Sequence, residues 1–508
     1  MTRTKVMINC LPTGVPGFDA LLGGGLPEFS FNLIAGQPGS GKTTLAHQIM
    51  FSLASPERPA LFLTVLGEPP LKMLRYQQQF DFFNEDAIND YIRFVNLSEE
   101  TLSGDLDLVL ARIIEEVGTQ KPGLVFIDSF RSVVRASLLD GNAHAKLEHF
   151  VQQLGVMMTS WQATSFLIGE YIEPGDVNPV FTVADGLIWL RQSSQRNSMV
   201  RKIEVVKMRG QAAMPGQHSF RIDKPGIRIY APIRTLRIEN DERPAARLQF
   251  GIPQLDDMLG GGLPEHYSLL IAGPSGSGKS VLAAAFLAEG ARLGETGVVA
   301  AFEQRPTRKR HSPVLAQLIE DGAVNVIDSS RPDLSVDEII VLLVDEIHRV
   351  GATRVLIDSL SGFEIALAPT FREEFRESML RLVNTLTDLG VTVVMTCELE
   401  DRYSDLRFSP YGTAFLTDAI IVQRYIEVDS RLRRMMAVVK VRASAHSDAL
   451  REYMIDENGI QIGEMLIGEE GLLGGRPTKK RIKEPAADTE ANDTGLDSHH
   501  QLVPDGGK

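Results

Sequence analysis

Two segments of the chain combine glycines, a lysine and a hydroxyl residue at the spacing that binds phosphate groups. Gly36 to Thr43 reads GQPGSGKT, and Gly273 to Ser280 reads GPSGSGKS. Each follows an apolar run that predicts a strand and opens a helical pattern, which is the context that the phosphate-loop motif requires. The glycines let successive backbone N–H groups turn inward around phosphate oxygens, and the start of the helix adds a favourable potential. The candidate binding residues are Gly36, Gly39, Gly41, Lys42, Thr43 and Thr44 in the first segment and Gly273, Gly276, Gly278, Lys279 and Ser280 in the second.

Both segments also have partners suited to a magnesium ion. In each, the lysine can reach the terminal phosphates, and the hydroxyl that follows it can bind Mg²⁺. Downstream, two aspartates end apolar runs, in FIDS and LIDS. A strand-end aspartate alone more often caps a helix or closes a turn, but beside a phosphate loop its carboxylate can hold the water shell of the metal. The metal candidates are Thr43 and Asp128 in the first segment and Ser280 and Asp358 in the second.

The two segments belong to a repeat that spans most of the chain. GVPGFDALLGGGLPEFSFNLIAGQPGSGK, from Gly14, matches GIPQLDDMLGGGLPEHYSLLIAGPSGSGK, from Gly251, without a gap. Later landmarks also correspond: LVFIDSF pairs with RVLIDSL, and VVKMRG pairs with VVKVRA. Each copy has about 230 residues, within the size range of one domain. The pattern therefore predicts a duplicated globular unit and not a solenoid of short repeats.

Within each copy, apolar runs of strand length alternate with helical patterns. FNLIAG, ALFLTVL, LVFIDS and SFLIGE in the first copy, and SLLIAG, GVVAAF, VLIDS and VTVVMT in the second, predict buried strands of a mostly parallel sheet. Helical spacing covers 106–116 and 335–350. This alternation predicts an α/β fold with ligands at the carboxyl ends of the strands. We expect domains over 1–240 and 248–473, joined near NDERPAAR, and a disordered tail over 474–508, which is poor in large apolar residues.

Composition narrows the class of protein. The formal net charge of −14 argues against a chain whose main partner is nucleic acid or an anionic membrane. The two cysteines, Cys10 and Cys397, have no metal-ligand spacing, which fits a reducing cytoplasm. Pro12 and Gly14 interrupt the amino terminus before a signal peptide can develop, and no apolar run reaches membrane-spanning length. We therefore expect a cytoplasmic protein.

Taken together, these motifs resemble the KaiC family of double-domain ATPases and autokinases in the RecA-like superfamily. The resemblance rests on the two phosphate loops, the GGGLP lead-in to each, the IDS strand ends and a K-x-R near the close of each copy, and it covers roughly Leu11 to Gly468. It implies two tandem RecA-like phosphate-loop domains that bind ATP and Mg²⁺. It also implies a two-tiered homohexameric ring with nucleotide held between neighbours, and protein partners of a KaiB-like or signalling type.

The ring implied by the resemblance gives the K-x-R pairs a role. We expect Lys207 with Arg209, and Lys440 with Arg442, to lie on a late strand of each copy. From there they could reach the nucleotide of the next subunit and offset charge on its terminal phosphoryl group. The alternative is a charged strand face in water. If the pairs act between subunits, a monomer should be nearly inactive.

The chain departs from the family at the residues that would activate water. KaiC-like domains carry adjacent glutamates just after the second strand, and each copy here keeps one of the two. In LGEPP, Gly67 replaces the first glutamate and Glu68 remains; in FEQRP, Glu303 remains and Gln304 replaces the second. An amide can orient water but cannot act as a base at neutral pH. We predict slow hydrolysis in both copies, with Glu68 and Glu303 as the bases.

A second departure concerns phosphorylation of the protein itself. The family has an adjacent serine and threonine ahead of the T-D of the second domain, whereas GTAFLTDAII places Ala414 and Phe415 there. Ser409, Thr413 and Thr417 are nearby hydroxyls, but a shifted position changes the geometry of attack. Serine/threonine kinase activity therefore remains an open alternative, and a two-site phosphorylation clock is not expected.

Two other functions remain open. A DNA motor of the RecA or RadA type would need basic or aromatic loops after the third and fourth strands, but YIEPGDVNP and CELEDRYSDLR are acidic. A nucleotide-binding scaffold with negligible hydrolysis agrees with the incomplete glutamate pairs. The main interpretation is a KaiC-like ATPase that serves as a signalling or timing switch as nucleotide is bound, hydrolysed and released.

Overall fold

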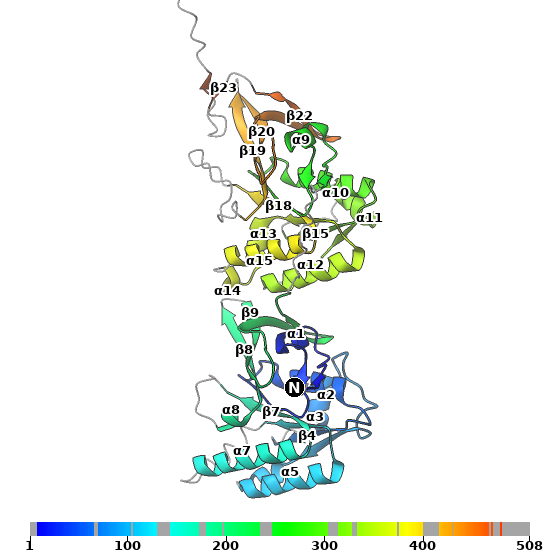
Figure 1. The fold of residues 1–508 in the computed structure, drawn as a ribbon, viewed down its shortest axis with the longest axis vertical. Coiled ribbons are helices and arrows are strands. Elements are labelled where there is room, and N and C mark those ends of the chain that lie inside the picture. The colour runs from blue at the N-terminus through cyan, green and yellow to red at the C-terminus, as the bar shows by residue number, and fades with distance from the viewer. Residues whose placement is uncertain are drawn as a thin grey trace, which may run out of the picture.

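The computed structural model contains two α/β domains that follow one another along the long axis of the molecule (Figure 1). The structure describes residues 8–65, 70–102, 105–129, 143–171, 179–195, 198–233, 246–302, 313–327, 333–372, 375–399, 416–428, 430–466, 469–470 and 478–479. The junction expected near Asn240 to Arg247 lies mostly outside these residues. So does the tail expected from Gly474, apart from the two residues of its short strand.

The first domain is built on a nine-stranded mixed sheet. Its strand order is β11-β10-β9-β8-β3-β7-β6-β4-β5. The six strands β8, β3, β7, β6, β4 and β5 are parallel to one another, and β9, β10 and β11 continue the sheet as antiparallel strands. The elements are β1 (Cys10–Leu11), α1 (Phe18–Leu22), β2 (Leu26–Pro27), β3 (Phe31–Gly36), α2 (Lys42–Leu53), β4 (Ala60–Thr64), α3 (Pro70–Gln77), β5 (Ile92–Asn96), α4 (Ser98–Leu102), α5 (Leu106–Gln120), β6 (Leu124–Asp128), α7 (Ala143–Ser160), β7 (Thr164–Glu170), α8 (Pro179–Val183), β8 (Gly186–Gln195), β9 (Ser198–Met208), β10 (Gln217–Asp223) and β11 (Gly226–Tyr230).

The second domain repeats this topology. Its sheet has the order β16-β15-β17-β18-β14-β19-β20-β21-β22, in which each strand matches its counterpart in the first domain. The elements are β12 (Arg247–Leu248), α9 (Pro253–Met258), β13 (Leu263–Pro264), β14 (Ser268–Gly273), α10 (Lys279–Arg292), β15 (Gly297–Ala301), α11 (Pro313–Glu320), β16 (Val324–Val326), α12 (Val336–Val350), β17 (Arg354–Asp358), α13 (Leu360–Ala366), α14 (Pro369–Arg372), α15 (Phe375–Asp388), β18 (Thr392–Glu398), β19 (Ala419–Val428), β20 (Arg431–Val441), β21 (Arg451–Asp456), β22 (Gly459–Met465), β23 (Glu469–Glu470) and β24 (Thr478–Lys479).

The predicted α/β fold with mostly parallel sheets is confirmed. Every residue of β3 and β14 is buried, as expected for central strands covered on both faces. The helical spacing predicted over 106–116 and 335–350 corresponds to α5 and α12, whose buried apolar residues recur every three or four positions. Asp105 caps the first of these helices and Ser335 caps the second, each through its side-chain oxygen.

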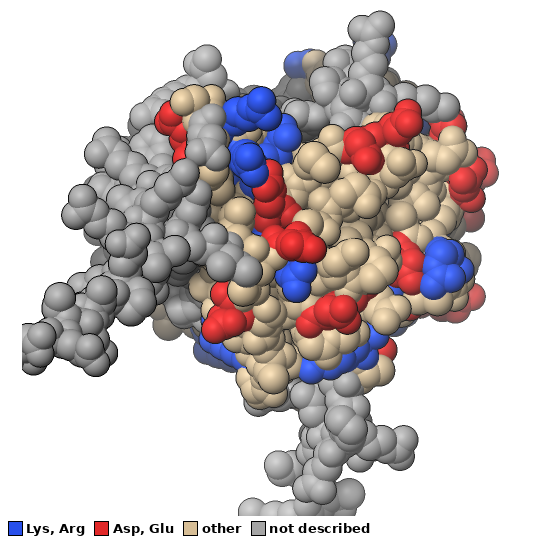
Figure 2. Space-filling model, turned by 90° about the horizontal axis from the view of Figure 1, so that it is seen from above, with Lys and Arg blue, Asp and Glu red and all other residues tan. Residues whose placement is uncertain are grey.

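The end of the molecule that the second domain forms carries both positive and negative side chains. Seen from that end, Lys and Arg side chains alternate with Asp and Glu side chains over an otherwise uncharged surface (Figure 2). The described residues of this face therefore form no continuous basic band. Among the helices that the structure describes, none is both long and apolar enough to cross a membrane.

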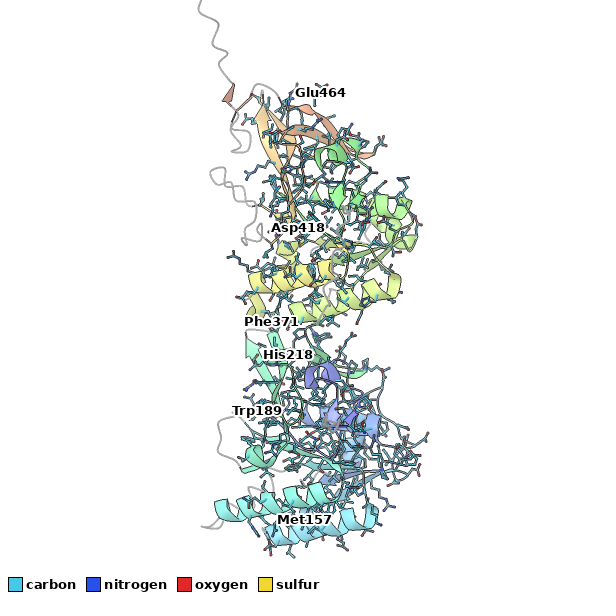
Figure 3. The ribbon with its side chains drawn as sticks, viewed as in Figure 1. Met157, Trp189, His218, Phe371, Asp418 and Glu464 are labelled. Carbon is cyan, nitrogen blue, oxygen red and sulfur yellow. The ribbon has the colours of Figure 1, made fainter. Side chains whose placement is uncertain are left out.

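The two domains contact one another through the β10–β11 hairpin of the first and α12 of the second. Arg221 donates to Glu338 across 2.6 Å, and the Glu338 side chain is only 2% exposed. The hydroxyl groups of Ser219 and Ser335 lie 2.7 Å apart. Farther along the junction, the Lys202 ammonium group lies 5.4 Å from the ring centroid of Phe371. Figure 3 labels His218 and Phe371 on the two sides of this junction. Buried hydrogen bonds and charge pairs therefore hold the domains together.

Candidate active sites

The first phosphate loop connects the central strand β3 to helix α2. Gly41, the residue before the helix, has a φ of 102°. A Cβ atom at this position would lie 2.7 Å from Cδ1 of Ile222. Its counterpart Gly278 has a φ of 100°, and a Cβ atom there would lie 2.4 Å from Cδ1 of Ile455. Both loops therefore need glycine for a left-handed backbone and for the close approach of a side chain from the antiparallel half of the sheet.

Each loop lysine folds back over its own loop. Nζ of Lys42 donates to the carbonyl oxygen of Gln37 at 2.8 Å, and Nζ of Lys279 donates to the carbonyl oxygen of Pro274 at 2.9 Å. Burial lowers the pKa of Lys42, whereas the carboxylates of Glu170 and Asp128 act in the opposite direction. The ammonium group therefore lies within the loop, where the phosphates of a nucleotide are expected, with negative charge close by.

The structure brings the predicted metal candidates of the first domain together. The hydroxyl of Thr43, at the start of α2, donates to the Asp128 carboxylate at the end of β6 across 2.7 Å. Mg²⁺ prefers hard oxygen ligands of this kind. In the second domain the hydroxyl of Thr396, on the adjacent strand β18, donates to Asp358. The carboxylate at each strand end therefore accepts a hydrogen bond from a hydroxyl group. In the first domain this hydroxyl belongs to the predicted residue Thr43, and in the second it belongs to Thr396.

A cavity of about 360 Å³ surrounds the first phosphate loop. Its volume falls within the range of small-ligand pockets. Besides loop residues it is lined by Thr64, Asp128, Glu170 and Ile222. Glu170 was missed by the sequence analysis, although a signal was available: it ends strand β7, whose carboxyl end lies beside that of β6. Glu398 ends β18 in the second domain, so each domain carries a second strand-end carboxylate.

The predicted bases lie outside the described residues. Glu68 follows β4 and Glu303 follows β15, and neither has a described position. Of the candidate phosphate acceptors, Ser409 and Thr413 are also outside. Thr417 is described; it is only 1% exposed, and its carbonyl oxygen accepts a hydrogen bond from Nζ of Lys440.

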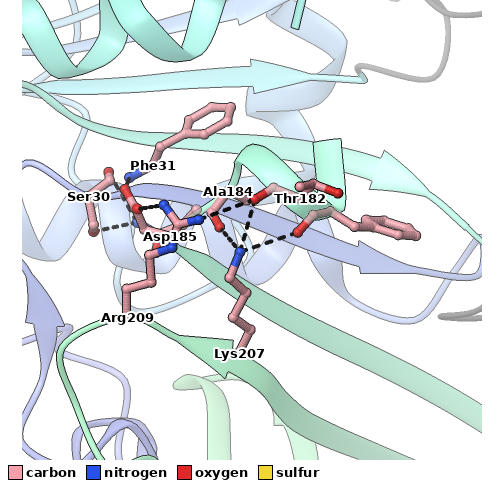
Figure 4. Close-up of polar contacts among 9 residues, drawn as sticks. Ser30, Phe31, Thr182, Ala184, Asp185, Lys207 and Arg209 are labelled. Carbon is pink, nitrogen blue, oxygen red and sulfur yellow. Dashed lines mark hydrogen bonds and ion pairs between the residues drawn. The ribbon is translucent and has the colours of Figure 1, made fainter. Parts of the chain in front are cut away.

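The K-x-R pairs lie near the ends of β9 and β20 and contact their own chain. Nζ of Lys207 donates to the carbonyl oxygens of Phe181, Thr182 and Ala184 at 3.4, 3.1 and 2.6 Å, at the end of helix α8 (Figure 4). Burial lowers the pKa of Lys207, with a further contribution from the nearby Arg209 guanidinium. Burial likewise lowers the pKa of Lys440, and Arg442 adds to the effect. Lys207 therefore donates to three backbone carbonyl groups and Lys440 to that of Thr417.

The two arginines keep a large exposed surface. Arg209 forms a salt bridge with Asp185 at 3.1 Å and retains 59% side-chain exposure. Arg442 forms the equivalent salt bridge with Asp418 at 3.2 Å and retains 51%. Both guanidinium groups are held on one side and open to solvent on the other.

Two phosphate loops on duplicated α/β sheets define a tandem nucleotide-binding ATPase. Comparison with known families agrees: the model described as "ATPase: KaiC" matches residues 11–234 and 248–466. The chain belongs to the KaiC family, and this membership implies nucleotide binding and ATP hydrolysis.

Relatives match over nearly the whole chain. The circadian clock oscillator protein KaiC of Rippkaea orientalis is 26% identical over 495 residues, which cover 95% of this chain and 94% of the relative. The circadian clock protein KaiC3 of a Synechocystis species is 28% identical over 490 residues, which cover 92% of this chain and 95% of the relative. The similarity therefore includes both domains.

Proposed function

We propose that this chain is a Mg-ATP-binding, slowly hydrolysing ring protein that acts as a signalling or timing switch. In this proposal, each nucleotide pocket is completed by the K-x-R pair of the adjacent subunit. The family match supports the ATPase chemistry. The relatives are named as circadian clock proteins, which supports the switching role.

The observation that carries the proposal is the distance between each K-x-R pair and the phosphate loop of its own domain. Asp185, the partner of Arg209, accepts a hydrogen bond from the backbone of Phe31, the first residue of β3. The phosphate loop begins at the other end of that strand, after Gly36. Five residue steps of about 3.3 Å separate these ends by about 16 Å. Arg209 is therefore remote from its own phosphate loop, and this separation supports a role at the nucleotide of another subunit.

The residues at the first loop have distinct roles in this proposal. Backbone N–H groups of the loop bind phosphate oxygens, and Lys42 exchanges the Gln37 carbonyl for a phosphate. Thr43 and Asp128 would hold the metal, and Glu68 orients and deprotonates water. Bound Mg²⁺ would offset charge on the β- and γ-phosphate oxygens. Lys207 and Arg209 of the neighbour stabilise the charge that develops on the terminal phosphoryl group.

The wider assembly is part of the same proposal. We propose the two-tiered homohexamer that the resemblance to the KaiC family implies, in which both domains contact the adjacent copy, with KaiB-like or signalling proteins as partners. Autokinase activity is a weaker component, because Thr417, the described hydroxyl candidate, is buried and therefore poorly placed to receive a phosphoryl group.

The test is ADP release by the full chain with Mg·ATP, combined with solution mass. We expect a slow rate in the wild type, a partial loss in E68Q and in E303Q, and near-background release in the double variant, all at hexamer mass. Indistinguishable background rates in all four proteins would favour the scaffold. Full activity in the monomer would contradict completion of the site by a neighbour. A phosphopeptide map of the same samples tests the autokinase.

A further inference from the structure

One aspartate in each domain links the strand that leads to the phosphate loop with the strand that carries the K-x-R pair. Asp185 directly precedes β8, the strand that lies between β3 and β9 in the sheet. Asp418 directly precedes β19, which lies between β14 and β20. The main chain fixes both aspartates. The N–H of Asp185 donates to the Phe31 carbonyl at 2.7 Å, and the N–H of Asp418 donates to the Ser268 carbonyl at 2.9 Å. Each aspartate is therefore bound at the first residue of the strand that leads to its phosphate loop.

The two carboxylate oxygens of Asp185 accept hydrogen bonds from different residues. Oδ2 accepts the N–H of Phe31 at 3.1 Å, while Oδ1 accepts Nη1 of Arg209 at 3.1 Å (Figure 4). The N–H of Arg209 also donates to the Asp185 carbonyl at 2.9 Å. Both the backbone and the side chain of Arg209 are thus fixed to the start of β3.

The second domain reproduces this arrangement. Oδ2 of Asp418 accepts the N–H and the hydroxyl of Ser268 at 3.0 and 2.8 Å, and Oδ1 accepts Nη1 of Arg442 at 3.2 Å. The N–H of Arg442 donates to the Asp418 carbonyl at 2.9 Å. In both domains, one aspartate oxygen binds the start of the phosphate-loop strand and the other binds the arginine. Because this pair of contacts occurs twice, a chance surface salt bridge is a poor explanation.

The arrangement orients the arginine and leaves it accessible. A guanidinium group has five N–H donors, and the aspartate engages one of its nitrogens. More than half of each arginine side chain remains exposed. An unrestrained arginine would lose about 2 kcal/mol of rotamer entropy on being fixed, and a charge-assisted hydrogen bond limits that freedom before a ligand arrives.

We propose that Asp185 and Asp418 are positioning residues that orient Arg209 and Arg442 toward the nucleotide of the adjacent subunit. This inference rests on the proposed function, in which the arginines act between subunits. Removing the carboxylate charge weakens the 3.1 Å bond from Nη1 of Arg209 and leaves mainly the longer bond from Nη2 to the Thr182 carbonyl at 3.4 Å, so the guanidinium group can swing. Since misplacement by about 1 Å can cost up to roughly 100-fold in rate, D185N should slow hydrolysis in the neighbouring pocket.

The test uses rings of two kinds of full-length subunit, all carrying E303Q so that ADP release reports the first domain. Donor subunits carry K42A, which disables their own first pocket but leaves Arg209 intact. Acceptor subunits carry R209A and keep an intact first pocket. Each kind alone should be nearly inactive, and mixing should restore ADP release where a donor arginine faces an acceptor pocket.

D185N is then placed in one kind of subunit at a time. A positioning role predicts that D185N in the donor lowers the restored rate by about 10-fold or more, whereas D185N in the acceptor, which has no Arg209, leaves it unchanged. An equal loss in both placements, or a loss confined to the acceptor, would show that Asp185 only supports its own strand and would overturn the inference. An unchanged rate in both would also overturn it.

Failure of the proposed function gives a different result. If mixed rings without D185N recover no activity although their mass is that of the hexamer, the arginines do not act between subunits, and both proposals fall. Thermal unfolding of the two D185N subunits provides the folding control. Equal melting temperatures combined with a loss confined to the donor separate orientation of Arg209 from a structural defect.

Discussion

Replacing Gly41 by alanine should disable nucleotide binding at the first site through two separable effects. The residue has a φ of 102°, so alanine there adopts a left-handed backbone at a cost of about 1–2 kcal/mol. The new Cβ atom would also lie 2.7 Å from Cδ1 of Ile222, and an overpacked contact of this kind costs about 1–3 kcal/mol. If the loop escapes both costs by leaving its phosphate-binding conformation, the affinity should fall by about 30-fold or more.

Gly216 is a matched control for the backbone effect. It has a φ of 92°, but a Cβ atom there would meet no heavy atom within 4 Å. G216A should therefore lower thermal stability without changing nucleotide affinity. The clash is tested separately by G41A/I222V, which removes Cδ1 of Ile222 and should recover about 5-fold or more of the lost affinity.

The assay is calorimetric titration with a magnesium-bound, non-hydrolysable ATP analogue, in a K279A background that silences the second site. The expected order of affinity is the parent, equal to G216A, then G41A/I222V, then G41A. Equal affinity in G41A and the parent would refute the argument that this loop conformation binds phosphate. If the double variant bound no better than G41A, the contact with Ile222 would be excluded as the cause.

Three further predictions concern the metal, pH and a buried charge. T43V should abolish the dependence of first-site binding on Mg²⁺ and T43S should preserve it, because only the hydroxyl contacts Asp128; equal metal dependence in both titrations would contradict this. Burial lowers the pKa of His47 to about 3, below its unfolded value, so the folded state should lose up to about 1.4 kcal/mol per pH unit as the pH falls below about 6.5. H47F should remove this slope from urea unfolding curves, and an unchanged slope would assign it to other groups. Arg354 is 1% exposed, pairs with Glu295 at 2.6 Å and donates to the carbonyls of Gln249 and Phe286, so R354L should destabilise the second domain by about 1–3 kcal/mol by leaving these acceptors without their donor. R354L/E295Q should recover part of that loss in the same unfolding measurement, and a melting curve unchanged by R354L would contradict the role of the pair.

The sequence predicted those features that depend on local pattern. The phosphate loops follow from residues adjacent in the chain, and the apolar runs identified the parallel strands beside them. Asp128 was correctly placed at a strand end, where it contacts Thr43. Of the antiparallel strands, the late strand expected at each K-x-R pair corresponds to β9 and β20. The strands that follow them were not predicted, because their half-exposed pattern resembles that of many surface segments.

Contacts between distant residues could not be predicted in the same way. Asp185 and Phe31 are 154 residues apart, and only the crossover of the sheet makes them neighbours. Arg354 occupies the strand position that Leu124 has in the first domain, so a repeat comparison gives no reason to expect a fully buried charge there. Glu170 could have been suspected from its place at the end of a predicted strand, but its closeness to the phosphate loop depends on strand order and not on spacing.

The β10 strand serves both domains with alternate side chains. Ser219 and Arg221 meet the second domain, while Phe220 and Ile222 pack toward Gly41 of the first phosphate loop. Because side chains alternate between the faces of a strand, a slip of one residue would exchange the two sets. An insertion or deletion within this strand therefore keeps the two sets of side chains on their own faces only if it adds or removes an even number of residues. The same condition applies when the strand is grafted onto another scaffold.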